Sequence, residues 1–483
     1  MQRCILFLFV LFHGTSYSQE SVLSIFKNAV TALPANDAVL SNGLKTADYQ
    51  DLDKDPKIFA IHGWMNKDQS FTWNINVKEK ADYKIAVLLQ VKGLSSNASI
   101  TLQLSSPKGI ISLRSRNAGW DKMFFPDLIG LEEGNNTLQL KLENVPEGQH
   151  PDISVYSIEA GTQKAWQQNN TDAEKLRSKP KWFTEAKYGL FFHWNARSAP
   201  RTGEPKSYEN AVKDFDVTKF AAMVHETGAD FIVLTTSWDL QTFPAPLKSL
   251  DKLLPGNTTT RDLVADLADA LSRWNIKLMV YCNVRLNRLG WKKEDRFVRE
   301  NMDGYFNKMN SIYQEIGKRY AKKIGGLWID DGMGLYGYNF PFQKMVKELK
   351  KNDKEMIIGF NSWIYPRFTD FQDFYVGENG ISMEAAAVSN KALLLGGNGY
   401  FVSGPQQGLK ATFCGLLEPG NWTHTELNQE IPPPLLKTDE LITIMKEAIK
   451  KKNAAILNTE VYQDGTISPA TFDMLKQLNK AVH

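Results

Sequence analysis

Two adjacent carboxylates, Asp330 and Asp331, stand directly after an apolar run in the stretch GGLWIDDGMG. The run has the composition of a β-strand, whereas aspartate is a poor strand former and is costly to bury. Paired carboxyl groups are also the usual means of general acid–base and nucleophilic catalysis. What these two aspartates do depends on the elements that surround the strand.

Other predicted strands of the same half of the chain also end in polar residues with tryptophans beside them. A bowl of indole rings mixed with carboxylates and amides suits a sugar, because the rings stack on its apolar faces and the polar groups bind its hydroxyls. The alternative is that these side chains only close the fold and cap helices. The residues are His193, Trp194, Asn195, Trp238, Asp239, Asn283, Arg285, Trp328, Asp330, Asp331, Asn361 and Trp363.

The elements that carry these residues alternate between strands and helices over 181–483. Apolar strand-like runs such as KYGLFFHWN, DFIVLTTSW, KLMVYCNV, GGLWIDD, MIIGFNSW, YFVSG and AAILNTEV are separated by amphipathic helices. We expect one helix to follow Asp216 and stop at Gly228, and another, from about Thr260, to turn Trp274 inward. This pattern predicts a (β/α)8 TIM-like barrel, whose active site lies at the carboxyl ends of the strands. A doubly wound sheet is the runner-up, although no G-x-G-x-x-G follows the first strand.

Side-chain parity limits which of the two aspartates faces the barrel axis. Successive side chains on a strand point to opposite faces, so Trp328 and Asp330 share one face and Ile329 and Asp331 share the other. Only one aspartate can therefore point along the axis, and its neighbour should turn towards the helices. Parity alone leaves the choice open.

The preceding half of the chain has the period of two that β-strands show. Alternation such as Phe71, Trp73, Ile75 and Val77 predicts an antiparallel β-sandwich over 19–160, joined to the barrel by a polar linker or connecting helix over 161–180. The sandwich resembles carbohydrate-binding modules of secreted glycosidases. Its function is either glycan binding or bracing of the barrel. Its tryptophans Trp64, Trp73 and Trp120 are either sugar platforms or core.

The N-terminus has the features of a secretory signal peptide over 1–18. Arg3 precedes an apolar run that ends in the small-residue stretch Ser16-Tyr17-Ser18. A membrane anchor is the alternative, but the run is shorter than the roughly 20 residues that span a bilayer. We expect a protein without a membrane span that is secreted to an extracellular, periplasmic or lysosomal location. Its N-glycosylation sequons are at Asn97, Asn135, Asn169, Asn257 and Asn421.

Composition narrows the class of protein further. The chain has 483 residues, enough for at least two cores, and a formal charge of +3 that gives no electrostatic footprint for nucleic acid. Outside the signal, only Cys282 and Cys414 remain. They are predicted to be separate core residues, with a disulfide as the alternative.

Five blocks of the second half resemble those of one family in the right order. These blocks are WFTEAKYGLFFHWN, GADFIVLTT, GGLWIDD, DFYVGE and NAAILNTEVYQDGTISP. They are similar to the blocks of the α-L-fucosidase family, glycoside hydrolase family 29, and the chain looks like a divergent member. The resemblance implies that Asp330 is the catalytic nucleophile, that Glu378 is the acid/base and that His193 binds the sugar. It thereby favours Asp330 over Asp331.

Simple chemistry agrees with these implied roles. A retaining glycosidase needs two carboxyl groups about 5–5.5 Å apart, one ionised and one protonated. Asp330 and Glu378, at the ends of successive strands, are placed for this, although a glutamate before Asn-Gly is also an ordinary turn residue. We expect no metal and no cofactor. The sugar subsite is predicted to be formed by His193, Trp194, Trp238, Asp239, Asn283 and Trp363.

Several departures from the family pattern weaken the substrate prediction. The chain has TTSWDLQ where two adjacent histidines are usual, so Trp238 and Asp239 stand in their place. An expected arginine is not at its usual spacing, and Arg367 is only a candidate. The interval from nucleophile to acid/base is longer, and the sandwich precedes the barrel instead of following it.

The sequence therefore predicts a secreted, retaining, exo-acting glycoside hydrolase of α-L-fucosidase type that acts on fucosylated or related glycans. Two other hypotheses remain open. One is a catalytically inactive glycan-binding protein that kept the pocket. The other is a hydrolase for a different sugar, with Asp239 as one of its working carboxylates. The sequence does not predict the oligomeric state.

Overall fold

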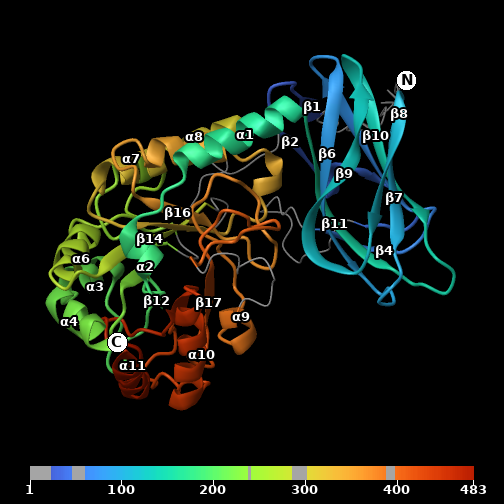
Figure 1. The fold of residues 1–483 in the computed structure, drawn as a ribbon. Helices are drawn as coiled ribbons and strands as arrows, with labels where there is room; N and C mark the ends of the chain where they lie inside the picture. Colours follow the sequence, from blue (N-terminus) through green and yellow to red (C-terminus); the bar gives the residue numbers. More distant parts are fainter. Residues whose placement is uncertain (1–22, 46–59, 238–240, 285–301, 388–397) are drawn as a thin grey trace, which may run out of the picture.

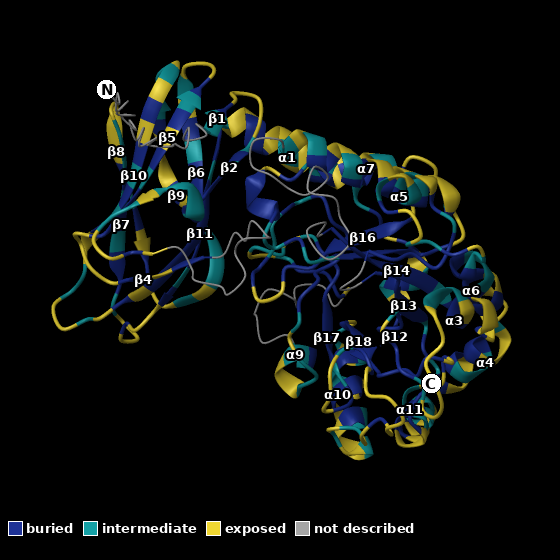
Figure 2. Ribbon diagram, turned by 180° about the vertical axis from the view of Figure 1, so that it is seen from behind, coloured by how far each residue is buried: buried dark blue, intermediate teal, exposed yellow. Residues whose placement is uncertain are grey.

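The structure is a computed structural model of the whole chain, and residues 23–45, 60–237, 241–284, 302–387 and 398–483 are described. Two β-sheets packed face to face form the N-terminal part, and a third, curled sheet surrounded by helices forms the rest (Figure 1). Figure 2 shows that the strands of the curled sheet are buried and that the helices around it expose their outer faces, whereas strands of the sandwich are buried only in part. The predicted signal peptide lies outside the described residues.

The first sheet of the sandwich has six strands within the described residues and the second has five. Strand β1 pairs with β5 in parallel, so the predicted purely antiparallel sandwich is wrong at this edge. The first sheet contains β1 (Leu23–Ile25), β3 (Val39–Leu40), β5 (Ser70–Val77), β7 (Ile100–Ser106), β8 (Gly109–Ser115) and β10 (Gly134–Asn144). The second contains β2 (Thr31–Pro34), β4 (Ile61–Trp64), β6 (Ala81–Lys92), β9 (Ala118–Leu131) and β11 (Asp152–Gly161).

The curled sheet is parallel throughout its seven described strands, which run in the order β16-β15-β14-β13-β12-β18-β17. The predicted eight-stranded barrel is thus confirmed only as an α/β fold with a curled parallel sheet. Its strands are β12 (Tyr188–Phe192), β13 (Phe231–Thr235), β14 (Lys277–Asn283), β15 (Gly326–Asp330), β16 (Ile357–Phe360), β17 (Thr412–Leu416) and β18 (Ala454–Asn458).

Eleven α-helices belong to the described residues. Six of them (α4, α6, α7, α8, α10 and α11) alternate with strands as predicted, whereas α2, α3, α5 and α9 were not predicted and α1 is the connecting helix. Asp216 caps the helix after the first strand with its carboxylate, and Gly228 ends that helix in a left-handed conformation, as predicted. Trp274 is 45% exposed instead of inward, because its helix ends two residues earlier at Ser272. The helices are α1 (Gln163–Leu176), α2 (Lys181–Glu185), α3 (Tyr208–Asp214), α4 (Val217–Thr227), α5 (Lys248–Leu253), α6 (Leu263–Ser272), α7 (Met302–Arg319), α8 (Phe342–Leu349), α9 (Met383–Ala387), α10 (Thr438–Lys450) and α11 (Pro469–Val482).

An irregular segment, 373–376, connects the two edges of the curled sheet. On one side the Asp373 N–H donates to the carbonyl of Ile358 in β16. On the other side the Tyr375 N–H donates to the carbonyl of Lys410, just before β17. The stretch YFVSG, which was predicted as a strand, forms none. The place between β16 and β17 is therefore held by the residues that lead into Glu378.

A buried ion pair holds this segment in place. The Lys350 ammonium lies 2.7 Å from the Asp373 carboxylate, and the two side chains are 5% and 1% exposed. Lys350 also donates to the Leu176 carbonyl and the Ser178 hydroxyl. Because the Asp373 carboxylate additionally accepts the backbone N–H groups of Ser178 and Ile358, its charge is fully compensated.

We expect Lys350→Met to lower the free energy of unfolding by about 3–5 kcal/mol, because it leaves the Asp373 carboxylate buried without a counter-ion. Denaturant unfolding of the whole chain measures this change. The matched control is Lys323→Met, at an exposed pair with Asp269, where the expected loss is about 1 kcal/mol or less. Equal losses in the two variants would show that the buried pair does not stabilise the segment.

Other sequence predictions have mixed outcomes. Cys282 and Cys414 are both free and buried, which confirms them as separate core residues. Of the sequons, Asn97, Asn135 and Asn421 are exposed, whereas the side-chain amides of the other two donate to Asp370 and to the Gln241 carbonyl. No described helix has both the length and the apolar character needed to cross a membrane.

Candidate active site

Two buried carboxylates meet at one amide group at the carboxyl end of the curled sheet. The Asn361 Nδ2 donates at 2.8 Å to the Asp330 Oδ1 and at 2.8 Å to the Glu378 Oε1. These two oxygens can therefore be no further apart than twice that distance. Asp330 comes from the end of β15, Asn361 from the residue after β16, and Glu378 from the end of the segment 373–376.

The orientation of the Asn361 amide is set by the backbone. Its Oδ1 accepts the N–H of Trp363 at 2.9 Å, which turns the Nδ2 towards the two carboxylates. Asn361 is 0% exposed, so no water competes for these bonds. Trp363 has a positive φ of 51° and is 37% exposed.

Asp331 does not turn away from the site as strand parity predicted. Its φ of 56° is left-handed, so the alternation of a strand ends at Asp330. Its carboxylate accepts the side-chain amide of Asn283, at the end of β14, and its backbone N–H donates to the Asp330 Oδ1 at 2.7 Å. Three carboxylates, not two, therefore lie close together.

The environment makes both members of the carboxylate pair hard to ionise. Burial, followed by the neighbouring charges of Asp331 and Glu378, raises the pKa of Asp330 to about 7, against hydrogen bonds that lower it. Burial likewise raises the pKa of Glu378, with Asp331 adding to it and the Asn361 hydrogen bond opposing it. Both groups therefore keep their protons to higher pH than an exposed carboxyl group does, and because they interact, the titration belongs to the pair and not to either residue alone.

This raised pKa predicts a pH-dependent stability. A carboxyl group whose pKa is higher in the folded than in the unfolded state loses its stabilising contribution as the pH rises from about 4 to about 7. Asp330→Asn removes the buried charge, so we expect its free energy of unfolding, relative to the parent, to increase by roughly 1–3 kcal/mol over that interval.

Denaturant unfolding at a series of pH values measures the change, with Asp214→Asn as the control. The pKa of Asp214 is lowered by Lys206 at an exposed site, so this variant should gain no stability with pH. A flat difference between Asp330→Asn and the parent from pH 4 to pH 8 would contradict the raised pKa.

His193 lies in the wall of the site as a neutral imidazole. Burial lowers its pKa to about 3. Its Nδ1 lies 2.7 Å from the Asn458 Oδ1, an acceptor, so the proton sits on Nδ1 and Nε2 is an acceptor. The ring packs between Phe191 and Trp422 at centroid distances of 4.1 and 5.0 Å. An acceptor framed by aromatic rings suits a sugar hydroxyl.

Tyr281 connects His193 with the carboxylates. Its ring lies 5.5 Å from the imidazole, and the charges of Asp330 and Asp331 raise the pKa of its buried hydroxyl together with burial itself. A hydroxyl that stays protonated beside Asp330 helps to hold that carboxylate in place. Trp328 packs on the same inner face, next to Phe191.

Some predicted site residues lie elsewhere. Trp194 is 1% exposed and donates to the Gln463 carbonyl among the helices, because it follows His193 by one position and faces the opposite side of the sheet. Arg367 pairs with Asp370 and donates to the Gln407 carbonyl, so its contacts do not bring it to the carboxylates. Trp238, Asp239 and Arg285 lie outside the described residues.

Three contributors were not among the predicted site residues: Tyr281, Asn458 and Trp422. A signal existed for Tyr281, which shares a strand face with Asn283, and for Asn458, which ends β18 within the predicted strand AAILNTEV. Trp422 gave no usable signal, since it follows β17, which was not predicted. Asn361 was named as a polar strand end, without a role. In the described part of the chain, no group of three or more histidine, cysteine, aspartate or glutamate side chains is arranged to hold a metal.

A close pair of carboxyl groups at the carboxyl end of a parallel α/β sheet is an arrangement that glycoside hydrolases use. The model of the α-L-fucosidase family matches residues 154–482 of the chain. The chain therefore belongs to the α-L-fucosidase family. No curated protein matches it in sequence.

Solved structures that are similar to part of this chain include the following three. An endo-fucoidan hydrolase of glycoside hydrolase family 107 is 12% identical with a TM-score of 0.48, covering 65% of this chain and 53% of its own. A Thermotoga maritima α-L-fucosynthase is 18% identical with a TM-score of 0.46, covering 63% and 74%. A Bacteroides thetaiotaomicron α-L-fucosidase is 15% identical with a TM-score of 0.44, covering 63% and 74%. This chain thus spans about half of the first enzyme.

Proposed function

We propose that this protein is a retaining, exo-acting glycoside hydrolase that releases terminal α-L-fucose or a closely related sugar. The observation that carries the proposal is the shared Asn361 amide, which keeps one oxygen of Asp330 and one of Glu378 within twice 2.8 Å of each other. This bound fits the spacing of about 5–5.5 Å used by retaining enzymes and not the 6.5–9.5 Å or so of inverting ones.

In the first step the Asp330 carboxylate attacks the anomeric carbon. The bond from that carbon to the leaving oxygen breaks, and Glu378 gives its proton to that oxygen. This step requires one ionised and one protonated carboxyl group. The raised pKa of Glu378 favours its protonated form, which is the form that the proposed acid needs.

In the second step Glu378, now ionised, takes a proton from a water molecule. The water oxygen bonds to the anomeric carbon and the bond to Asp330 breaks, which restores both groups. Two inversions at one carbon give net retention of configuration. The water-poor surroundings of the pair strengthen each electrostatic interaction along this path.

Side chains around the carboxylate pair are proposed to contact the sugar ring. The His193 Nε2 accepts a hydrogen bond from one sugar hydroxyl. The rings of Trp422 and Trp363 provide aromatic faces for the sugar to stack on. Asn283 and Asp331, hydrogen-bonded to each other, add polar groups on the side of β14. Trp238 and Asp239 are proposed to complete the subsite where the family usually has two histidines.

The proposal is tested with purified protein and an aryl α-L-fucoside. Sustained release of the phenol, with α-L-fucose as the first sugar product in NMR, supports it. β-L-Fucose as first product contradicts retention, binding of fucose without turnover makes the protein a glycan-binding protein, and turnover only of another glycoside in a panel changes the sugar.

We also propose that the protein is secreted, since residues 1–18 have the signal-peptide pattern and three sequons are exposed. N-terminal sequencing of protein recovered from the medium of a eukaryotic host tests this. A mature chain that begins near residue 19 supports secretion, and an intact Met1 in a chain retained by the cells contradicts it.

A further inference from the structure

The loop after the proposed nucleophile is a compact turn. The N–H groups of Leu335 and Tyr336 both donate to the Gly332 carbonyl, at 2.8 and 2.9 Å. Gly332 itself has no space for a side chain, because a Cβ there would lie 2.4 Å or less from the Tyr336 ring and hydroxyl. A displacement of this loop is therefore passed on to Asp331 and Asp330.

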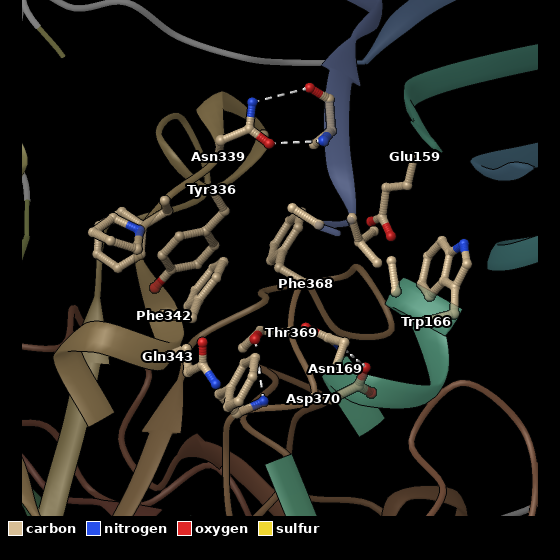
Figure 3. A pocket seen from close by; sticks show the side chains of 18 of the residues that line it. Glu159, Trp166, Asn169, Tyr336, Asn339, Phe342, Gln343, Phe368, Thr369 and Asp370 are labelled. Atoms are coloured by element: carbon tan, nitrogen blue, oxygen red, sulfur yellow. Dashed lines mark hydrogen bonds between the residues drawn. The ribbon is translucent and has the colours of Figure 1, made fainter. Parts of the chain in front are cut away.

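The sandwich holds this loop at two points. The Tyr156 hydroxyl, from β11, donates to the Met333 carbonyl at 2.6 Å. Asn339, at the end of the loop, bonds to the backbone of β2: its Oδ1 accepts the Ala32 N–H at 2.7 Å, and its Nδ2 donates to the Ala32 carbonyl at 3.2 Å (Figure 3). The two hydrogen bonds between the Asn339 side chain and the Ala32 backbone have the same pattern as the pairing of two neighbouring strands.

Tyr156 also contacts the loop that carries Asn361. Its ring lies 5.0 Å from those of Tyr365 and Phe368, and Trp120 of the sandwich packs on Tyr365 at 4.7 Å. Tyr365 in turn donates its N–H to the Ser362 carbonyl, one residue after Asn361. One side chain of the sandwich thus touches both loops that position the carboxylate pair.

The packing of the sandwich supports this role over that of a separate glycan-binding module. Tyr156 is 1% exposed and belongs to the apolar core of the helix-covered sheet, not to that of the sandwich. Trp64 and Trp73, two possible sugar platforms, are fully buried in the sandwich core. Trp120, the third, lies against Tyr365.

Around these contacts, the connecting helix α1 pairs with the helix-covered part through polar side chains. They line a cavity of about 370 Å³ between the sandwich, α1 and α8 (Figure 3). Asn169 of α1 donates to Asp370 at 2.9 Å, and Gln343 of α8 donates to Asp172 at 2.9 Å. The junction is therefore a specific interface, which a loosely tethered module does not need.

We infer that Tyr156 is a positioning residue of the active site, through which the sandwich fixes the Asp330 and Asn361 loops relative to each other. The expected change in kcat rests on the proposed function, whereas the effect of Tyr156 on the position of the two loops does not. Tyr156 touches no substrate. It acts by restricting the loops from which the reacting groups project.

The test compares Tyr156→Phe with Tyr83→Phe, each of which removes one tyrosine hydroxyl from a backbone carbonyl. The control hydroxyl donates to the Glu79 carbonyl at 2.9 Å within the sandwich. In Tyr156→Phe we expect kcat for an aryl α-L-fucoside to fall about 5- to 100-fold, since misplacement by about 1 Å costs up to that much. KM should change less than about twofold, and Tyr83→Phe should keep parental kcat.

A second readout does not need activity. The pH at which the stability advantage of Asp330→Asn over its parent stops growing reports the titration of the carboxylate pair in the folded state. A loosened, more hydrated pair should reach this plateau at lower pH in the Tyr156→Phe background. An unchanged titration together with parental kcat overturns the inference, as does an equal fall of kcat in both tyrosine variants. If the parent cleaves no glycoside, the proposed function fails while the titration still decides the role of Tyr156.

Discussion

Asp330→Asn is expected to lower kcat for an aryl α-L-fucoside by about 10⁴-fold or more, the size of loss that follows removal of a reacting group. The asparagine cannot form the covalent bond to the anomeric carbon, yet its oxygen can still accept the bonds from Asn361 and from the Asp331 N–H. The fold should therefore persist, with Tm within a few degrees of the parent near pH 5. Steady-state kinetics and thermal unfolding measure the two effects.

Asp331→Asn is the matched control for that loss. Its side chain lies beside the pair and bonds to Asn283, so its removal should affect binding and the pKa of the pair more than the chemical step. A nearly inactive Asp331 variant beside an active Asp330 variant would reverse the assignment of the nucleophile.

Glu378→Gln has the second largest expected effect, and that effect depends on the leaving group. Without the proton donor, kcat for a fucosyl disaccharide should fall by about 10²–10⁴-fold, the usual contribution of general acid–base catalysis. A dinitrophenyl fucoside needs no protonation, so its first step should remain fast and its glycosyl-enzyme should accumulate as a burst of phenol.

The dependence on leaving group separates the two carboxylates. The Asp330 variant should lose activity towards both substrates alike, since the nucleophile is needed whatever departs. Equal losses for both substrates in the Glu378 variant, without a burst, would remove its acid/base role.

Periodicity was sufficient to predict most of the fold. The change from a period of two to alternating strands and helices located both parts, and caps such as Asp216 and Gly228 marked helix ends. The parts of the fold that periodicity did not predict depend on hydrogen bonds between residues far apart in the sequence. Segment 373–376 joins β16 and β17 by a few hydrogen bonds on each side, which no local pattern reveals. YFVSG has the composition of a strand but forms only an isolated bridge, between Tyr400 and Lys410.

The site was predictable as far as strand rules apply. Asp330, Glu378 and His193 were named, and the structure brings Asp330 and Glu378 to one amide. Parity failed for Asp331 because the backbone turns left-handed there, and it was not applied to Trp194, which it would have placed opposite His193. Asn361 was noticed only as a strand end, since its role depends on where Trp363 directs its amide.

The role of the sandwich could not be decided from sequence because it lies in a junction between distant segments. Tyr156 and Met333 are 177 positions apart, and Ala32 and Asn339 are 307 apart. Nothing near Tyr156 in the sequence distinguishes it from a core residue of its own strand.

The central claim is that Asp330 attacks the anomeric carbon while Glu378 handles the proton, and azide rescue of Asp330→Gly tests it most directly. Azide fits the space left by the carboxylate and attacks the carbon in its place, so we expect restored turnover of an activated α-L-fucoside with β-L-fucosyl azide as the product, identified by NMR. The account is contradicted if azide restores nothing to Asp330→Gly, or if Glu378→Gly, and not Asp330→Gly, yields the β-azide.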